Sequence, residues 1–202
     1  MLELAKESPR DHLLLTLMRW GLRCGEIVGW RGLPGLRWED VRAGSLWIKG
    51  KGFRKGSAEP FSHYDPNQYA VPMPLEVMEE LRRYGDTFKH SAVDKVFSIS
   101  EVWAEQLVKR YARLAGIEDW QRVGPHRLRA FFATDAKDRE VDGFMIRDLM
   151  RHKHISTTNI YIGRSTPERM GRVVDRLAKH RRNSLCEGRS THLDRPGHSQ
   201  AS

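Results

Sequence analysis

Apolar residues near the start of the chain recur with the spacing of a helix. Between residues 9 and 21 they are Leu13, Leu14, Leu17, Met18 and Trp20. This spacing matches one face of a 3.6-residue repeat and predicts a helix that ends at Gly21. Gly25 and Gly29 interrupt the next stretch, so we expect at best a short helix within residues 23–31.

The pattern changes to that of short strands between residues 36 and 50. Apolar side chains lie on both sides of Ala43-Gly44, as is typical of two strands joined by a turn: Trp38, Val41, Leu46, Trp47 and Ile48. Gly50-Lys51-Gly52 then predicts a tight turn, and the polar residues 53–68 predict a long exposed loop. Residues 69–71 predict a third strand, because they precede Pro72 and a residue before proline favours extended geometry.

The rest of the chain has mostly helical spacing. The predicted helices cover residues 74–85, 100–115, 126–139, 143–151 and 167–180. Residues 181–202 form a basic polar tail without periodicity, which we expect to be disordered. The predicted fold class is therefore mainly α with a small three-stranded antiparallel sheet (α+β), in one domain over residues 1–180.

Charge changes this picture by indicating a class of partner. The 202 residues carry a net charge of +9, of which +3 lies in residues 179–202 and +6 in the part expected to fold. A basic body attracts polyanions, and nucleic acid first among them. No apolar run reaches the roughly 20 residues of a membrane helix, and residues 1–10 do not resemble a secretory signal. Cys24 and Cys186 form neither a disulfide framework nor a zinc site, so we expect a cytoplasmic protein.

Five segments carry residues suited to phosphate chemistry. They are Arg23 in GLRCGEIVGW, Lys51 in IKGKGFRK, His126 and Arg129 in GPHRLRAFFAT, His152 in LMRHKHISTT, and Tyr161 in TTNIYIG. In this order they resemble the tyrosine recombinase (phage integrase) family, whose pattern is G-L-R-x-x-E, a lysine on a β-turn, H-x-L-R, L-G-H and T-T-x-x-Y. The resemblance covers about residues 10–180, and the nine positions from His152 to Tyr161 match it closely.

The residue types also fit the chemistry on physical grounds. Guanidinium forks such as those of Arg23 and Arg129 stay charged and donate paired hydrogen bonds to a phosphate. His126 and Arg129 are three residues apart, so on a helix they share a face and both can reach one phosphate. A tyrosine such as Tyr161 needs a base or a cationic field to lose its proton. Lys51, between two glycines, can reach in as the general acid.

The resemblance implies an enzyme with a tyrosine recombinase catalytic-domain fold. It implies site-specific DNA recombination or integration, in which Tyr161 cleaves a strand and forms a 3′-phosphotyrosine intermediate without metal or cofactor. It gives His126 a base-like role and His152 a hydrogen bond to the phosphate. The implied partner is double-stranded DNA, bound by a homotetramer that is a monomer in solution. We further expect association with the nucleoid and absence of the N-terminal core-binding domain that full recombinases carry.

Each residue also has a plainer interpretation. Arg23 alone reads as a surface arginine, His126 and Arg129 as a solvated helix face, and Tyr161 as a packed aromatic. His152 and His154 can be read as metal ligands, although no third ligand is evident. Lys49 and Lys55 compete with Lys51 for the same role. We interpret Glu26 as an orienting partner of Arg23 or Arg129, and Trp30, Trp38, Trp47 and Phe131 as core.

Two positions depart from the family pattern. Arg151 stands where the family has glycine before the histidine, and it either strains a backbone with positive φ or adds a phosphate contact. Ala130 replaces a frequent second histidine. Two rivals to recombination therefore stay open: a catalytically inactive DNA-binding remnant of a recombinase, and type IB topoisomerase chemistry.

Overall fold

The computed structural model describes residues 1–50, 68–152, 154–162 and Gly171. Contacts divide the chain into two compact units, Met1–Ile162 and Gly163–Ser202, and every element named below belongs to the first. The loop predicted over residues 53–68, the helix over 167–180 and the tail over 181–202 lie almost wholly outside the described residues.

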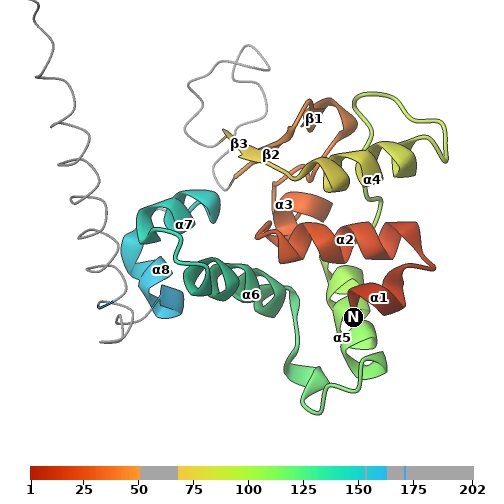
Figure 1. The fold of residues 1–202 in the computed structure, drawn as a ribbon. Coiled ribbons are helices and arrows are strands. Elements are labelled where there is room, and N and C mark those ends of the chain that lie inside the picture. The colour runs from red at the N-terminus through yellow and green to blue at the C-terminus, as the bar shows by residue number, and fades with distance from the viewer. Residues whose placement is uncertain (51–67, 153, 163–170, 172–202) are drawn as a thin grey trace, which may run out of the picture. The chain divides into compact units, whose positions relative to one another are not determined.

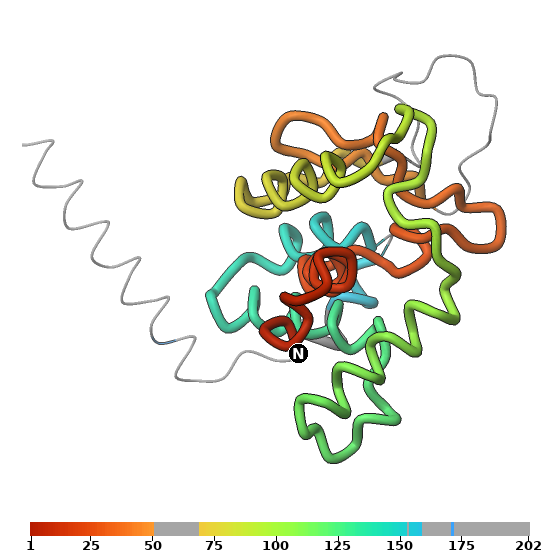
Figure 2. The backbone as a smooth tube through the Cα atoms, turned by 90° about the vertical axis from the view of Figure 1, so that its right-hand side faces the viewer, coloured from red at the N-terminus to blue at the C-terminus, as the bar shows by residue number. Residues whose placement is uncertain are grey.

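The N-terminal third of the chain contains one buried helix, α2 (Pro9–Arg19), which lies at the centre of the unit. Its residues from Leu13 to Met18 are all buried, because other helices cover it on several sides. It runs across the ribbon in Figure 1 and appears nearly end-on, surrounded by other elements, in Figure 2. The short helices α1 (Leu2–Ala5) and α3 (Cys24–Val28) flank it in sequence. The predicted helix over residues 9–21 is confirmed; α1 was not predicted.

The predicted antiparallel sheet is present, with strand order β1-β2-β3. A 3₁₀ turn, η1 (Trp38–Asp40), leads into β1 (Val41–Arg42), followed by β2 (Ser45–Lys49) and β3 (Gln68–Pro72). Leu46 of β2 pairs with Val41 on one side and Val71 on the other. Leu46 and Ile48 are buried while their neighbours in β2 are half-buried, which is the alternation expected of a sheet with one covered face.

The C-terminal half is helical, as predicted. It contains α4 (Leu75–Gly85), α5 (Glu101–Leu114), the turn η2 (Trp120–Arg122), α6 (Pro125–Asp138), α7 (Gly143–Leu149) and α8 (Ile155–Ile162). The helix predicted over 143–151 ends two residues early, because Arg151 adopts a left-handed backbone with φ of 54°. Helix α8 packs against α6 and α7, and it was absent from the predicted helices.

Two apolar clusters hold the unit together. The larger one joins α2, α3, the sheet, α4 and α5, and includes the fully buried Phe97. The smaller one joins α6 to α7 through Ala133, Ala136, Ile146 and Met150. Because α6 also contacts α2, the two clusters adjoin along α2 and α6.

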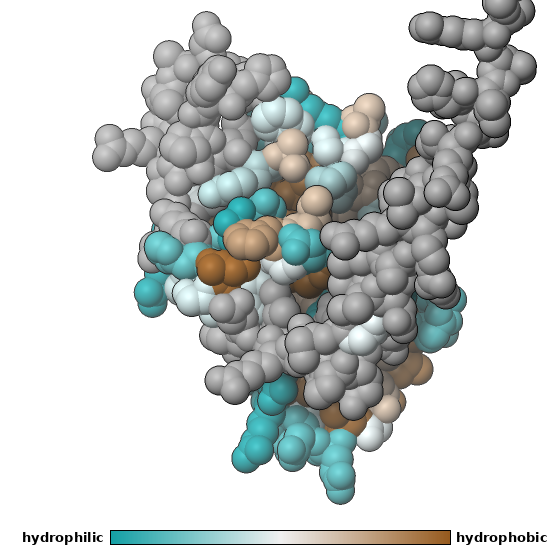
Figure 3. Space-filling view, turned by 60° about the vertical axis from the view of Figure 1, so that its left-hand side comes forward, coloured by the Kyte–Doolittle hydropathy of each residue, from teal (hydrophilic) through white to brown (hydrophobic). Residues whose placement is uncertain are grey.

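The interpretation of four aromatic residues as core is wrong for two of them. Trp30 is 46% exposed and Phe131 is 48% exposed. Trp38 packs against the larger cluster, and Trp47 is half-buried beneath the guanidinium of Arg42. Apolar side chains therefore reach the surface between polar ones, as Figure 3 shows for one side of the unit.

No helix in the described part of the chain is long and apolar enough to cross a membrane. The observed architecture agrees with the fold class predicted from the sequence, mainly helical with one three-stranded antiparallel sheet.

The start of α5 offers a test of the fold. Ser100 caps this helix by accepting a hydrogen bond from the Trp103 backbone N at 3.1 Å. Replacing Ser100 with Ala removes that acceptor and lowers the free energy of unfolding by about 1 kcal/mol, measured by urea denaturation. Ser98→Ala, two residues earlier and also exposed, is the matched control and leaves stability unchanged. Equal stability of both variants and the parent chain contradicts the cap.

Candidate active site

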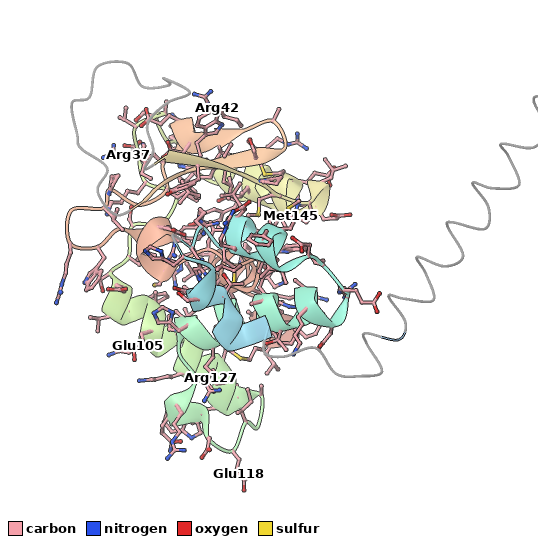
Figure 4. All side chains as sticks on the ribbon, turned by 90° about the vertical axis from the view of Figure 1, so that its left-hand side faces the viewer. Arg37, Arg42, Glu105, Glu118, Arg127 and Met145 are labelled. Atoms are coloured by element: carbon pink, nitrogen blue, oxygen red, sulfur yellow. The ribbon has the colours of Figure 1, made fainter. Side chains whose placement is uncertain are left out.

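One cavity of about 720 Å³ gathers four of the six predicted site residues: Arg23, His126, Arg129 and His152. They come from three places in the sequence, namely the start of α3, the first two turns of α6 and the turn between α7 and α8. The rest of the wall includes Glu26, Trp30, Gly50, Tyr69, Glu101 and Arg151. Figure 4 shows α6, α7 and α8 from one side, with Arg127 of α6 and Met145 of α7 labelled.

Arg23 is fixed at the start of α3 by Glu26. Its backbone N donates to Glu26 Oε2 at 2.8 Å, and its Nη1 donates to Glu26 Oε1 at 2.8 Å. The Arg23 side chain nevertheless remains 37% exposed. The interpretation of Glu26 as an orienting partner of Arg23 is confirmed, and Arg23 is oriented with part of its surface still open to the cavity.

Arg129 is buried, so the interpretation of this residue as part of a solvated helix face is wrong. Its guanidinium donates to the carbonyl oxygens of Gly21 and Met150. Gly21 has a φ of 83° in the turn after α2, a conformation that glycine adopts at low cost. His126, one turn before Arg129 on α6, is exposed at the cavity wall.

Arg151 points inward and pairs with Glu26. Its Nη2 lies 2.6 Å from Glu26 Oε2, and its Nε donates to Glu26 Oε1 at 3.3 Å. Its backbone closes α7 through hydrogen bonds from Arg151 N to Asp148 O and from His152 N to Arg147 O, the arrangement that favours glycine. The left-handed backbone costs roughly 1–2 kcal/mol for a residue with a Cβ. Of the two outcomes predicted for Arg151, the backbone with positive φ is therefore confirmed. Its side chain forms hydrogen bonds within the protein, to Glu26.

Glu26 is the buried centre of these contacts. Burial by itself raises the pKa of its carboxyl, but the Arg151 and Arg23 guanidiniums outweigh burial and hold that pKa below its usual value. Glu26 is therefore ionised. Arg23, Arg129 and Arg151 against Glu26 give a net positive charge to this wall of the cavity, whose lining also includes Glu101 and Glu105 of α5. Such a wall favours an anion.

His152 is neutral at physiological pH. Burial is the largest cause that lowers its pKa, from 6.5 to about 4, followed by the charges of Arg129, Arg23 and Arg151. Its Nδ1 lies 2.9 Å from the Oγ1 of Thr158, a fully buried residue of α8. Sequence reasoning missed Thr158 as a partner of His152; the only available signal was its place in the TTNIY segment.

The Lys49 ammonium is paired with two carboxylates, which argues against Lys49 as the alternative to Lys51 in the general-acid role. Its Nζ lies 2.9 Å from Asp40 Oδ1 and 3.4 Å from Glu39 Oε1. Lys51 and Lys55 lie outside the described residues. Gly50, immediately before Lys51, is on the cavity wall.

Tyr161 belongs to α8, and its side chain lies outside what the structure describes. The same helix provides Thr157 to the cavity wall and Thr158 to His152. Within the described residues no three His, Cys, Asp or Glu side chains form a cluster that could hold a metal, so the reading of His152 and His154 as metal ligands finds no support there.

Comparison with characterised proteins identifies relatives over most of the chain. It is 28% identical over 170 residues to a tyrosine recombinase of Pseudothermotoga lettingae, covering 80% of this chain and 52% of that protein. It is 37% identical over 166 residues to the tyrosine recombinase XerA of Thermococcus kodakarensis, covering 75% of this chain and 50% of that protein. The chain thus spans about half the length of the curated relatives it matches.

Solved structures share the fold at lower sequence identity. A XerA recombinase superposes with a TM-score of 0.63 at 20% identity, over 96% of this chain and 62% of that one. The Tn1549 transposon integrase in complex with transposon right end DNA gives 0.61 at 18% identity, over 88% of this chain and 62% of that one. The model of the phage integrase family matches residues 1–167. Because this match covers most of the sequence, the chain belongs to the phage integrase family.

Proposed function

We propose that this chain cleaves and rejoins DNA strands in site-specific recombination, through a covalent 3′-phosphotyrosine at Tyr161. The observation that carries the proposal is the convergence of Arg23, His126, Arg129 and His152 on one cavity from three separate parts of the sequence. The match to the phage integrase family and the fold shared with DNA-bound recombinases support it.

In this proposal the two arginines hold the scissile phosphate. Negative charge grows on the non-bridging oxygens in the transition state, and a fixed guanidinium is suited to receive it. Arg23 and Arg129 are held by Glu26 and by backbone carbonyls before any substrate arrives, so little rearrangement is needed. Loss of one such donor costs about 3–4 kcal/mol of activation free energy by analogy with oxyanion holes.

The Tyr161 oxygen attacks phosphorus and forms the phosphotyrosine bond, and the bond from phosphorus to the 5′ oxygen of the next nucleotide breaks. Tyr161 stands on α8 one turn after Thr157 and Thr158, the residues that reach the cavity and His152. His126 takes the proton that Tyr161 loses. The free 5′ hydroxyl later attacks the phosphotyrosine, so the bond energy is conserved and no energy source is consumed.

Lys51 supplies the proton that the leaving 5′ oxygen takes up. Two observations favour it over its neighbour: Gly50 lies on the cavity wall, and the Lys49 ammonium is paired with Asp40. In this proposal Thr158 Oγ1 donates to Nδ1 of the neutral His152 imidazole, and the proton on Nε2 is donated to the phosphate.

Double-stranded DNA is the proposed substrate, and residues 1–180 the proposed catalytic domain. The basic charge of the chain agrees with such a partner. Recombination joins two duplexes and needs four cleavage events, so the proposed assembly is a homotetramer on DNA formed from monomers in solution.

Replacing Tyr161 with Phe tests the nucleophile. The parent chain forms a covalent adduct with a nicked suicide duplex, seen as a slower band on a denaturing gel, and Tyr161→Phe forms none because the attacking oxygen is gone. The matched control is Tyr69→Phe on the same cavity wall, which retains adduct formation.

Three outcomes separate the rival functions. An adduct formed by Tyr161→Phe shows that another residue attacks DNA. Salt-dependent binding with no adduct from the parent chain favours a catalytically inactive DNA-binding protein. Relaxation of supercoiled plasmid without strand exchange favours topoisomerase chemistry.

The His152 imidazole titrates far below its ordinary range. In ¹⁵N-edited NMR of the free protein we expect a midpoint near pH 4. The unfolded chain binds this proton near pH 6.5. The contribution of the neutral His152 to the free energy of unfolding is therefore fully present above that pH, and it is lost as pH falls from about 6.5 towards 4. Inorganic phosphate in the cavity raises the midpoint. A midpoint near 6.5 without phosphate contradicts the buried, cation-flanked site.

Thr158→Val tests the orientation of His152. Valine fills the same space but removes the hydroxyl that contacts Nδ1, so we expect the rate of adduct formation to fall by about 10–100-fold, as for other partners that orient a functional imidazole, with DNA affinity unchanged. Thr134→Val is the matched control, since its exposed hydroxyl donates to the Ala130 carbonyl of its own helix. Equal rates for both variants rule out an orienting role.

A further inference from the structure

Arg151 stands at the family's glycine position, yet its side chain is among the most enclosed charged groups described, only 1% exposed. We propose that Arg151 is a positioning residue: it neutralises Glu26 so that Arg23 keeps its charge for the DNA phosphate, and it braces the carbonyls that hold both phosphate-binding arginines. This inference rests on the proposed function and adds to it a residue that the family pattern lacks.

The Arg151 guanidinium donates four hydrogen bonds to three residues. Besides the two bonds to Glu26, its Nη1 donates to the Leu149 carbonyl at 2.7 Å and its Nη2 to the Gly21 carbonyl at 3.1 Å. These acceptors belong to α3, the end of α7 and the turn after α2. One side chain therefore ties together the three segments that build the basic wall of the cavity.

The same acceptors hold the other two arginines. The Gly21 carbonyl accepts from both Arg151 and Arg129. The Arg151 carbonyl itself accepts from Arg23 Nη2 at 3.2 Å. A shift of the Arg151 backbone or of Gly21 thus moves the heads of both Arg23 and Arg129, and a displacement of about 1 Å is enough to lower a rate about 100-fold.

Charge gives Arg151 a second effect. Glu26 is 2% exposed and contacts Arg23 and Arg151 at similar distances, 2.8 and 2.6 Å. With Arg151 present, its positive charge offsets the Glu26 carboxylate, and the positive charge of Arg23 is not neutralised. Without it, the carboxylate cancels Arg23, the residue that faces the cavity with an exposed side chain.

The test uses Arg151→Met, which keeps the apolar stem and removes the charge. We expect single-turnover cleavage of the nicked suicide duplex to slow by about 100-fold, with the dissociation constant for DNA changed less than about threefold. Adding Glu26→Gln to this variant removes the uncompensated carboxylate and recovers about tenfold of the rate. Arg139→Met, an exposed arginine on a surface pair, is the control and leaves the rate unchanged.

A merely structural role predicts a different result. In that case the double variant is no faster than Arg151→Met, and the loss of rate follows the folded fraction measured by circular dichroism. Dependence on pH adds a further readout: the deficit of Arg151→Met relative to the parent shrinks as pH falls, because Glu26 without Arg151 becomes protonated. A deficit that is constant with pH, together with no recovery in the double variant, overturns the proposal.

A measurement that does not require catalysis distinguishes failure of the role proposed for Arg151 from failure of the proposed function. Removing Arg151 raises the pKa of His152, and removing Glu26 as well lowers it again, because these two charges act on the imidazole with opposite sign. If the parent chain forms no adduct, the proposed function fails, while this NMR titration still confirms or overturns the charge balance between Arg151 and Glu26.

A different observation points to a nucleotide contact at the rim of the same cavity. Trp30 and Arg31 lie on the cavity wall, and the Arg31 guanidinium stacks 4.4 Å from the centre of the exposed Trp30 ring. Arg31 has a φ of 41°, a strained value for a residue with a side chain. Strain of this kind persists only where the surroundings enforce it, and it is common at binding sites.

The surroundings of this stack are rigid. Trp30 N donates to Leu33 O at 3.2 Å and Leu33 N to Trp30 O at 2.8 Å, which closes a tight turn. Below the turn Gly29 and Gly35 have φ of 88° and 77°, and a Cβ on Gly35 would lie 2.8 Å from the Gly29 N. The turn also packs on α3, since a Cβ on Gly25 would meet Trp30 Cβ at 3.3 Å.

We infer that this stack binds the DNA nucleotide next to the scissile phosphate, with Arg31 on its backbone phosphate and Trp30 against its base or sugar. Aromatic rings and guanidiniums together recognise nucleotides in this way. Among the described residues no carboxylate is paired with Arg31, so its N–H donors remain available.

The test measures binding of a nicked duplex with 2-aminopurine beside the nick. We expect Arg31→Ala to weaken binding by about tenfold and to lower the salt slope by about one. We expect Trp30→Ala to abolish the quenching of 2-aminopurine that the parent produces. Arg113→Ala is the matched control, since Arg113 stacks on Trp120 elsewhere on the surface. Parental affinity, salt slope and quenching in both variants overturn the inference, and this assay does not depend on cleavage.

Discussion

The structure depends on one buried carboxylate shared by two guanidiniums. Glu26 joins Arg23 at the start of α3 to Arg151 at the end of α7. A buried carboxylate that loses one of its partners destabilises the fold by about 3–5 kcal/mol, because its charge is left uncompensated. The same contacts hold Arg23 beside the cavity, and Arg151 shares the Gly21 carbonyl with Arg129, so stability and the arrangement of the basic wall have a common origin. In the proposed function the cations that receive the phosphate are thus fixed before an anion arrives, which is the arrangement that electrostatic catalysis requires.

Local patterns predicted most of the elements. The spacing of apolar residues located α2, and the Ala43-Gly44 turn and the extended residues before Pro72 located the three strands. Such features depend on periods and turn residues that are visible within a short window. Helix α8 was missed, because the polar and apolar residues of ISTTNIYI are not separated onto opposite faces at helical spacing, and the helix is stabilised by packing against α6 and α7.

The candidate site was predictable only as a set of residues. The order of five short segments indicated which side chains belong together, and four of the six predicted side chains do line one cavity. The contacts among them were beyond prediction, since Arg151 meets Glu26 across 125 positions. Neither spacing nor composition distinguishes an arginine turned towards a buried carboxylate from one turned towards DNA. The exposure of Trp30 was missed for a similar reason: a large aromatic residue is usually core, and spacing does not reveal that Trp30 stands in a turn at the surface.

In the proposed function these cations hold a phosphate for attack by the tyrosine of α8. Mass spectrometry of the peptide that remains attached to DNA, after reaction with a nicked suicide duplex and digestion with protease, tests it most directly. We expect a single DNA-linked peptide with the modification on Tyr161. A linked peptide from any other part of the chain, or none from protein that binds the duplex, contradicts it.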